Sequence, residues 1–237
     1  MTPDLSLLLG TAATIGFVHT VLGPDHYLPF VAMAKARNWS MARMSVILLA
    51  CGVGHVGSSV VIGILGIALG WALGGMEAFE AARGAWAAWG LIGFGLAYGT
   101  WGVWRALRGR AHMHLHVHGD GTVHDHTHGH ADAHAHAHTT AGKVNITPWI
   151  LFTIFVFGPC EPLIPLLMVP AAQHSWWGLA LVTLVFGAVT ITTMAALSLA
   201  LTFGLNVLPL GRLERWSHAL AGFALFACGA AIQWLGL

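Results

Sequence analysis

The chain has 237 residues, of which 57% are hydrophobic and only 8% are charged. An ordinary soluble domain carries about 25% charged residues, which cover its surface. This composition therefore excludes a soluble globular protein. Ten basic and nine acidic residues also leave no net field that would attract a nucleic acid. Eleven tryptophans and 30 glycines are typical of membrane helices and of the aromatic belts at their ends.

Six apolar stretches are each long enough to cross the ~30 Å hydrocarbon core of a bilayer, which takes about 20 helical residues. Because no water is available there to satisfy the backbone, we expect these stretches to be α-helices. The predicted fold class is an all-α integral membrane protein with six transmembrane helices. The stretches cover residues 5–34, 44–73, 86–104, 148–172, 177–202 and 216–237.

Positive charges are concentrated on alternate connections between these stretches. Arg83, beside Glu77 and Glu80, is the one basic residue on the other side. The positive-inside rule then predicts a protein of the cell (inner) membrane with both termini outside and a cytoplasmic long loop. The first stretch follows Asp4 and no basic residue, so we expect it to be retained rather than cleaved as a signal peptide. The nine basic residues on the predicted cytoplasmic side are Lys35, Arg37, Arg43, Arg105, Arg108, Arg110, Lys143, Arg212 and Arg215.

A Gly-Pro pair occurs inside both the first and the fourth stretch, at Gly23-Pro24 and at Gly158-Pro159. Proline cannot continue a helix, so we expect a break at both places. Because the two stretches cross the membrane in opposite directions, the pattern predicts a 3+3 inverted repeat with discontinuous helices one and four. The expected divisions are a first membrane repeat at 1–110, a disordered cytoplasmic histidine-rich loop at 111–143 and a second membrane repeat at 144–237.

Five ionisable residues in the apolar stretches are candidate metal ligands. A charge inside a membrane helix costs ~2.5–3.5 kcal/mol on insertion scales, so each such residue requires an explanation. A straight helix would separate His19 and His26 by ~10.5 Å along its axis, whereas a break can bring them together. Imidazole and carboxylate ligands suit divalent Ni, Co, Zn or Fe. Taken singly, each histidine is also compatible with a structural hydrogen bond to a carbonyl. The predicted midplane metal site comprises His19, Asp25, His26, His55 and Glu161.

The segment 112–138 alternates histidine with other residues. This composition cannot form a packed core, so we expect it to be disordered. Neutral imidazole binds metal, and many imidazoles on one tether raise the local ligand concentration. We interpret the segment as a low-affinity collector of a divalent transition metal, with a pH-responsive polar linker as the alternative. Its histidines are His112, His114, His116, His118, His124, His126, His128, His130, His134, His136 and His138.

On these residues, the chain resembles the nickel/cobalt transporter (NiCoT) family and its relatives, which include hydrogenase- and urease-linked nickel permeases. The family signature is His, four residues, then Asp-His, and here five residues separate His19 from Asp25-His26. The run from Gly54 to Val61, which contains His55, is similar to the family's Gly-His-Ser-Thr-Val-Val phrase. The resemblance implies metal binding and selectivity roles for these residues. A cytoplasmic histidine-rich loop is similar to that of the efflux branch, which implies export of Ni²⁺ or Co²⁺.

Two other hypotheses use different chemistry. The run Gly158-Pro159-Cys160-Glu161-Pro162 is similar to the Pro-Cys-x-x-Pro phrase of the thiol-transporting cytochrome c biogenesis proteins, which implies a thiol–disulfide electron conduit. That function needs Cys51 or Cys228 within disulfide reach of Cys160. An intramembrane metal-dependent hydrolase would need a zinc ion with an open coordination position.

The favoured interpretation is a transporter and not an enzyme. We expect the divalent metal, Ni²⁺ or Co²⁺ ahead of Zn²⁺, to be its substrate, and we expect no prosthetic group. The expected partners are the metal ion and the lipid bilayer, with no nucleic acid and with a homo-oligomer left open.

Overall fold

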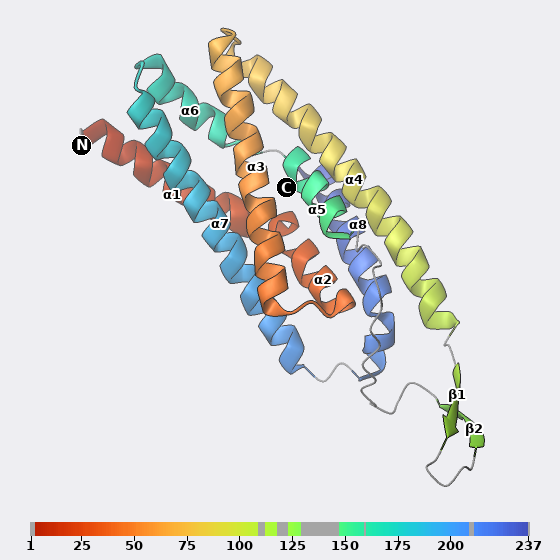
Figure 1. The fold of residues 1–237 in the computed structure, drawn as a ribbon. Coiled ribbons are helices and arrows are strands. Elements are labelled where there is room, and N and C mark those ends of the chain that lie inside the picture. The colour runs from red at the N-terminus through yellow and green to blue at the C-terminus, as the bar shows by residue number, and fades with distance from the viewer. Residues whose placement is uncertain are drawn as a thin grey trace.

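A computed structural model describes residues 3–108, 112–117, 123–128, 147–158, 160–208 and 211–236 (Figure 1). In these ranges the chain is almost entirely helical. The elements are α1 (Pro3–Leu22), η1 (Pro24–His26), α2 (Leu28–Arg37), α3 (Met41–Ala68), α4 (Leu73–Leu107), β1 (His112–Val117), β2 (Val123–His128), α5 (Thr147–Phe157), α6 (Leu163–Ala172), α7 (Trp176–Val207), η2 (Gly211–Trp216) and α8 (Ser217–Leu235).

Among the described residues, four helices are long and apolar enough to cross a membrane: Asp4–Leu22, Met41–Ala68, Trp176–Val207 and Leu213–Leu235. The 35-residue α4 is longer still, but glycine and tryptophan dilute its apolar stretch. α5 and α6 are shorter apolar helices. Large apolar side chains cover the outer surface of the bundle, as Trp176 shows with 73% of its surface exposed. Such a surface suits lipid and not water. The chain is therefore an α-helical membrane protein, whereas the six-span repeat stays a prediction.

Both Gly-Pro pairs lie where a helix ends. The apolar stretch predicted at 5–34 forms α1 and α2, with η1 between them. Gly23 donates the last helical hydrogen bond of α1, to His19 O at 3.0 Å, and then adopts an extended conformation with φ −88° and ψ 94°. Pro24 has no amide hydrogen with which to continue the helix. The stretch predicted at 148–172 is likewise divided, into α5 and α6.

α4 and α8 form the most extensive helix pair of the described chain. Glycines face each other along this contact. A Cβ atom on Gly222 would overlap the backbone of Gly99, and one on Gly95 would overlap the backbone of Phe226. Small residues permit this close backbone approach between membrane helices, where dispersion contacts replace the hydrophobic effect as the driving force.

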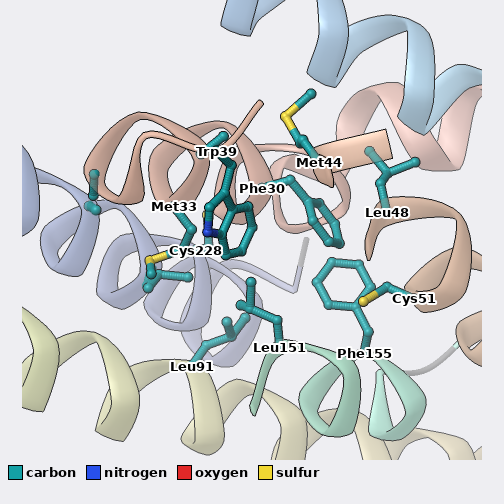
Figure 2. Close-up of a cluster of buried hydrophobic side chains, with 14 of the residues drawn as sticks. Phe30, Met33, Trp39, Met44, Leu48, Cys51, Leu91, Leu151, Phe155 and Cys228 are labelled. Carbon is teal, nitrogen blue, oxygen red and sulfur yellow. The ribbon is translucent and has the colours of Figure 1, made fainter. Parts of the chain in front are cut away.

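Two buried apolar clusters fill the bundle. The first joins α2, α3, α4, α5, α7 and α8, and Figure 2 shows how the rings of Phe30 and Phe155 face each other in it, with centroids 4.6 Å apart. The second joins α1, α3, α6 and α7. Cys51 belongs to the first cluster and Val56 to the second, so that His55, between them on α3, lies where the two clusters meet.

The histidine-rich segment includes an antiparallel hairpin, which Figure 1 draws beyond the end of α4. Strand β1 pairs with β2 so that His112 is opposite His128, His114 opposite His126, and His116 opposite His124. The two-residue alternation of histidine in these strands matches the period of a β-strand. The disorder expected for the loop at 111–143 stays a prediction. His118, His130, His134, His136 and His138 lie outside the described residues.

Candidate metal centre

Three histidines from separate elements converge in the middle of the bundle. His19 lies in the last turn of α1, His26 ends η1, and His55 lies in the middle of α3. The ring centroids of His19 and His26 are 4.7 Å apart, and those of His26 and His55 are 5.2 Å apart. One nitrogen from each ring lies within 4.8 Å of the other two. A tetrahedral ion with bonds of ~2.1 Å holds its nitrogens ~3.4 Å apart, so the group matches the size of a single-ion site.

Backbone carbonyls determine which nitrogen is available in two of the three rings. His26 Nδ1 lies 3.0 Å from Gly23 O, and His55 Nδ1 lies 3.2 Å from Phe155 O. A carbonyl oxygen only accepts hydrogen bonds, so both Nδ1 atoms must carry the proton. In the neutral ring the lone pair is then on Nε2. The Nε2 atoms of His19, His26 and His55 are buried and have no hydrogen-bond partner among the described residues.

This arrangement is the one that metal-binding histidines use. A ligating histidine usually donates its second ring N–H to a carbonyl or a carboxylate, which fixes both the tautomer and the orientation of the ring. A buried nitrogen lone pair without a donor is otherwise unfavourable, because its desolvation is not repaid by a hydrogen bond. The lone pairs of His26 and His55, together with the buried and unpartnered Nε2 of His19 beside them, therefore indicate a site for a cation that accepts neutral nitrogen ligands.

Each Gly-Pro break places its glycine against one of these rings. A Cβ atom on Gly23 would lie 2.6 Å from His26 Nδ1, and a Cβ atom on Gly158 would lie 3.2 Å from His55 Nδ1. The first distance is too short for any side chain, so only glycine permits the observed position of the His26 ring. The breaks therefore do more than end helices, because they leave room for the imidazoles.

The two predicted carboxylates have different positions. Asp25 is partly buried, and its Oδ1 lies 3.2 Å from His26 Nδ1, where it accepts from the same N–H as Gly23 O. This places Asp25 as a group that orients His26. Glu161 is exposed in the turn between α5 and α6, and the structure does not bring it into the three-histidine group. Pro159, in the second break, lies outside the described residues.

The sequence reasoning missed a buried polar cluster close to the site. We expected Glu80 and Arg83 on the outer connection between the second and third apolar stretches, yet they lie inside α4 and are 0% and 4% exposed. Arg83 Nη2 lies 2.6 Å from Glu80 Oε2. The spacing of three residues on one helix was the available signal, because it places opposite charges on the same face.

The cysteines form no pair in the structure. Cys51, Cys160 and Cys228 are all buried free thiols. Cys160 packs in the second apolar cluster, whereas Cys51 and Cys228 pack in the first. Neither the pairing nor the placement of the cysteines favours the thiol conduit.

Comparisons with protein-family models, with curated proteins and with solved structures found no match for this chain. The resemblance to the NiCoT family therefore rests on the residues quoted above and stays a prediction. The geometry of the three histidines is independent of that resemblance.

Proposed function

We propose that this chain is a divalent transition-metal transporter related to the NiCoT family, with Ni²⁺ or Co²⁺ as its substrate. The observation that carries the proposal is the convergence of three buried imidazoles, two of which have their Nδ1 protons held by carbonyls. Imidazole nitrogen suits Ni²⁺, Co²⁺ and Zn²⁺ and not Mg²⁺ or Ca²⁺. Asp25 adds a negative charge beside the site, which favours a divalent cation over a neutral molecule.

The position of the site at two helix breaks supports transport over a purely structural ion. Transporters place their substrate sites at discontinuous helices near the bilayer midplane, because the segments on either side of a break can move separately. His26 and the Gly158 region belong to such breaks, whereas His55 lies on the continuous helix α3. A rearrangement at either break would change the distances among the three rings and release the ion.

The pattern of helix contacts supports an inverted repeat. Under this proposal α1 and α2 correspond to α5 and α6, α3 corresponds to α7, and α4 corresponds to α8. Several contacts between the halves then occur in matched pairs: α1 packs on α7 as α5 packs on α3, and α2 packs on α8 as α6 packs on α4. The contacts of α3 with α7 and of α4 with α8 join corresponding helices to each other, whereas the contact of α4 with α5 has no counterpart of similar extent between α8 and α1. Such pairing is expected of two related halves that face each other across an axis.

The histidine-rich segment supports export as the direction of transport. It shares its connection with four of the nine basic residues that the positive-inside rule assigns to the cytoplasm. The register of β1 and β2 pairs three histidines of one strand with three of the other. A collector on the cytoplasmic side would supply metal to the membrane site for removal from the cell. In this proposal the protein lies in the cell (inner) membrane with both termini outside.

The test is metal flux in vesicles that contain the purified protein. We expect wild-type protein to move Ni²⁺ or Co²⁺ and the variants His19→Ala and His55→Ala to lose at least nine-tenths of this flux. The matched control is His174→Asn, since His174 is exposed and far from the site in sequence. Asparagine is chosen because His174 has a φ of 53°, which Asn tolerates better than Ala.

Three results would contradict the proposal. Flux that persists in both histidine variants would remove the site assignment. Tight metal binding by wild-type protein without any flux would favour the intramembrane hydrolase, for which an assay against lipid and peptide substrates would follow. Loss of activity in Cys160→Ser with unaltered metal binding would instead favour the thiol conduit.

A further inference from the structure

Glu80 and Arg83 form a buried ion pair on α4, and neither residue has a role in the three-histidine group. Both side chains are almost completely buried, whereas Glu77, one turn away on the same helix, is exposed. Removing two charges from water is costly, and their attraction offsets that cost only with good geometry and further hydrogen bonds. The hydrogen-bond partners of Glu80 and Arg83 therefore show what offsets the cost of burying the pair.

The partners lie in the last turn of α5 and on the unwound backbone between α5 and α6. The last carbonyl oxygens of a helix accept no hydrogen bond from the helix itself, so they need a donor from another part of the molecule. Arg83 supplies it: Nη1 lies 3.4 Å from Val156 O, and Nη2 lies 3.1 Å from Gly158 O. On the other side of the break, the amide of Cys160 donates to Glu80 Oε2 at 3.3 Å. The cation thus binds carbonyls and the carboxylate binds an amide of the same short segment.

Ser59 completes this arrangement from α3. Its Oγ lies 3.0 Å from Glu80 Oε2, 2.5 Å from Arg83 Nη2 and 3.2 Å from the amide nitrogen of Cys160. We call Ser59, Glu80 and Arg83 the α4 clamp. It joins α3 and α4 to the break, because each member contacts the backbone or a side chain of the other two elements.

The clamp lies next to the candidate metal centre. Ser59 follows His55 by four residues on α3, which places both on one face of that helix. The carbonyl that accepts from His55 Nδ1 belongs to Phe155, and the next carbonyl along the chain, that of Val156, accepts from Arg83. The position of one short piece of backbone therefore determines both sets of hydrogen bonds.

We propose that Glu80 and Arg83 are positioning residues that hold the segment between α5 and α6 and, through the Phe155 carbonyl, fix the orientation of the His55 ring. The first part of the proposal concerns the backbone alone. The second part rests on the proposed function, because it treats His55 as a ligand of the transported metal.

The first part is tested by the reactivity of Cys160, whose thiol is fully buried and whose amide the clamp holds. In a Cys51→Ala/Cys228→Ala background, Cys160 is the one thiol, and its rate of reaction with N-ethylmaleimide reports opening of the break. We expect Arg83→Met to raise this rate at least tenfold, Glu80→Gln to raise it less, and Arg83→Lys to restore part of the protection. Glu77→Gln is the matched control and should leave the rate unchanged.

A single substitution leaves one buried charge unpaired and can prevent folding. The double variant Glu80→Gln/Arg83→Met removes both charges, so it should fold, as judged by gel filtration and circular dichroism, while it still loses the clamp. Unchanged labelling rates in this folded double variant would overturn the proposal.

The second part is tested with Co²⁺ alone, by titration calorimetry and X-ray absorption on the detergent-solubilised full chain. Loss of a group that orients a ligand typically weakens metal binding 10–100-fold. We expect about tenfold weaker Co²⁺ binding in the double variant, with fewer imidazoles around the ion, and partial recovery in Arg83→Lys. Unchanged affinity and coordination despite faster labelling would overturn the link to His55. If wild-type protein binds no Co²⁺, the proposed function fails, while the labelling rates still decide the role of the clamp.

Discussion

The carbonyl oxygen of Gly23 lies 3.0 Å from Nδ1 of His26, three residues later, and the Cα of the same glycine faces the imidazole ring. One residue therefore both accepts the ring proton and leaves the space that the ring fills. The relationship links the helix break to the ligand set, because the conformation that ends α1 also points the Nε2 lone pair of His26 towards its neighbours.

Substitution of Gly23 by Ala should damage the metal centre without unfolding the bundle. The new Cβ atom would lie 2.6 Å from His26 Nδ1 and 2.9 Å from Asp25 Oδ1, so the ring must move. We expect Co²⁺ affinity to fall at least tenfold, measured by titration calorimetry. Gly57→Ala is the control, because a Cβ atom there meets nothing within 4 Å. Equal affinities in the two variants would show that the ring position is not critical.

Metal binding should stabilise the folded protein, because the three ligands come together only in the native state. At a free metal concentration of 100 times Kd, the expected gain is about 2.7 kcal/mol. We expect the thermal unfolding temperature of wild-type protein in detergent to rise by several degrees on addition of Ni²⁺ or Co²⁺. His55→Ala should lose this rise, and His174→Asn should keep it. A rise of equal size in His55→Ala would place the stabilising ion elsewhere.

Asp25 should act on the metal through His26. Its carboxylate lies 3.2 Å from His26 Nδ1 and raises the basicity of that ring, as carboxylates do beside metal-binding histidines. Asp25→Asn keeps the shape but removes the charge, so we expect 10–100-fold weaker Co²⁺ binding with the number of coordinated imidazoles unchanged. Asp4→Asn, which alters an exposed carboxylate on α1, is the control. A change in the coordinated oxygen count in Asp25→Asn would instead make Asp25 a direct ligand.

The contact between α4 and α8 should tolerate no side chain at Gly222. A Cβ atom there would overlap the backbone of Gly99, which cannot yield as a side chain can. We expect Gly222→Ala to lower the free energy of unfolding by about 1–3 kcal/mol, the usual cost of overpacking. Gly93→Ala on α4, where a Cβ atom has open space, should be neutral or slightly stabilising because Ala favours helix. Detergent-to-SDS titration of both variants measures the difference.

Deletion of residues 112–138 should change how transport depends on metal concentration and leave the membrane site intact. The segment supplies many weak ligands on one tether, so we expect its loss to lower the local metal concentration alone. We expect half-maximal flux at a several-fold higher Ni²⁺ or Co²⁺ concentration, with the maximal rate retained. Complete loss of flux in a correctly folded deletion variant would assign the segment to the transport path.

The sequence was sufficient to predict the helical membrane architecture, the two breaks and the convergence of three histidines. Apolar length determines where a membrane helix can form, and proline determines where it must end, so both features depend on local chemistry. The approach of His26 to His19 followed from the break between them. The approach of His26 to His19 needed no knowledge of how distant helices pack, whereas the approach of His55 depends on how α3 packs beside them.

The buried pair on α4 and the exposed position of Glu161 could not be predicted in the same way. The burial of Arg83 depends on carbonyls of Val156 and Gly158, more than 70 residues away, and no local pattern reveals that contact. Glu161 follows the break closely, and the turn there, rather than its depth in the apolar stretch, determines that its side chain is exposed.

The extensive contact between α4 and α8 also constrains how the protein is made. During synthesis α4 is made long before α8, which follows α7 in the chain. The glycine face of α4 has no native partner in this interval, and the carbonyls that receive Arg83 arrive only with α5. Until the second half is made, the first half therefore has an unmatched glycine face and a charge pair without its backbone partners.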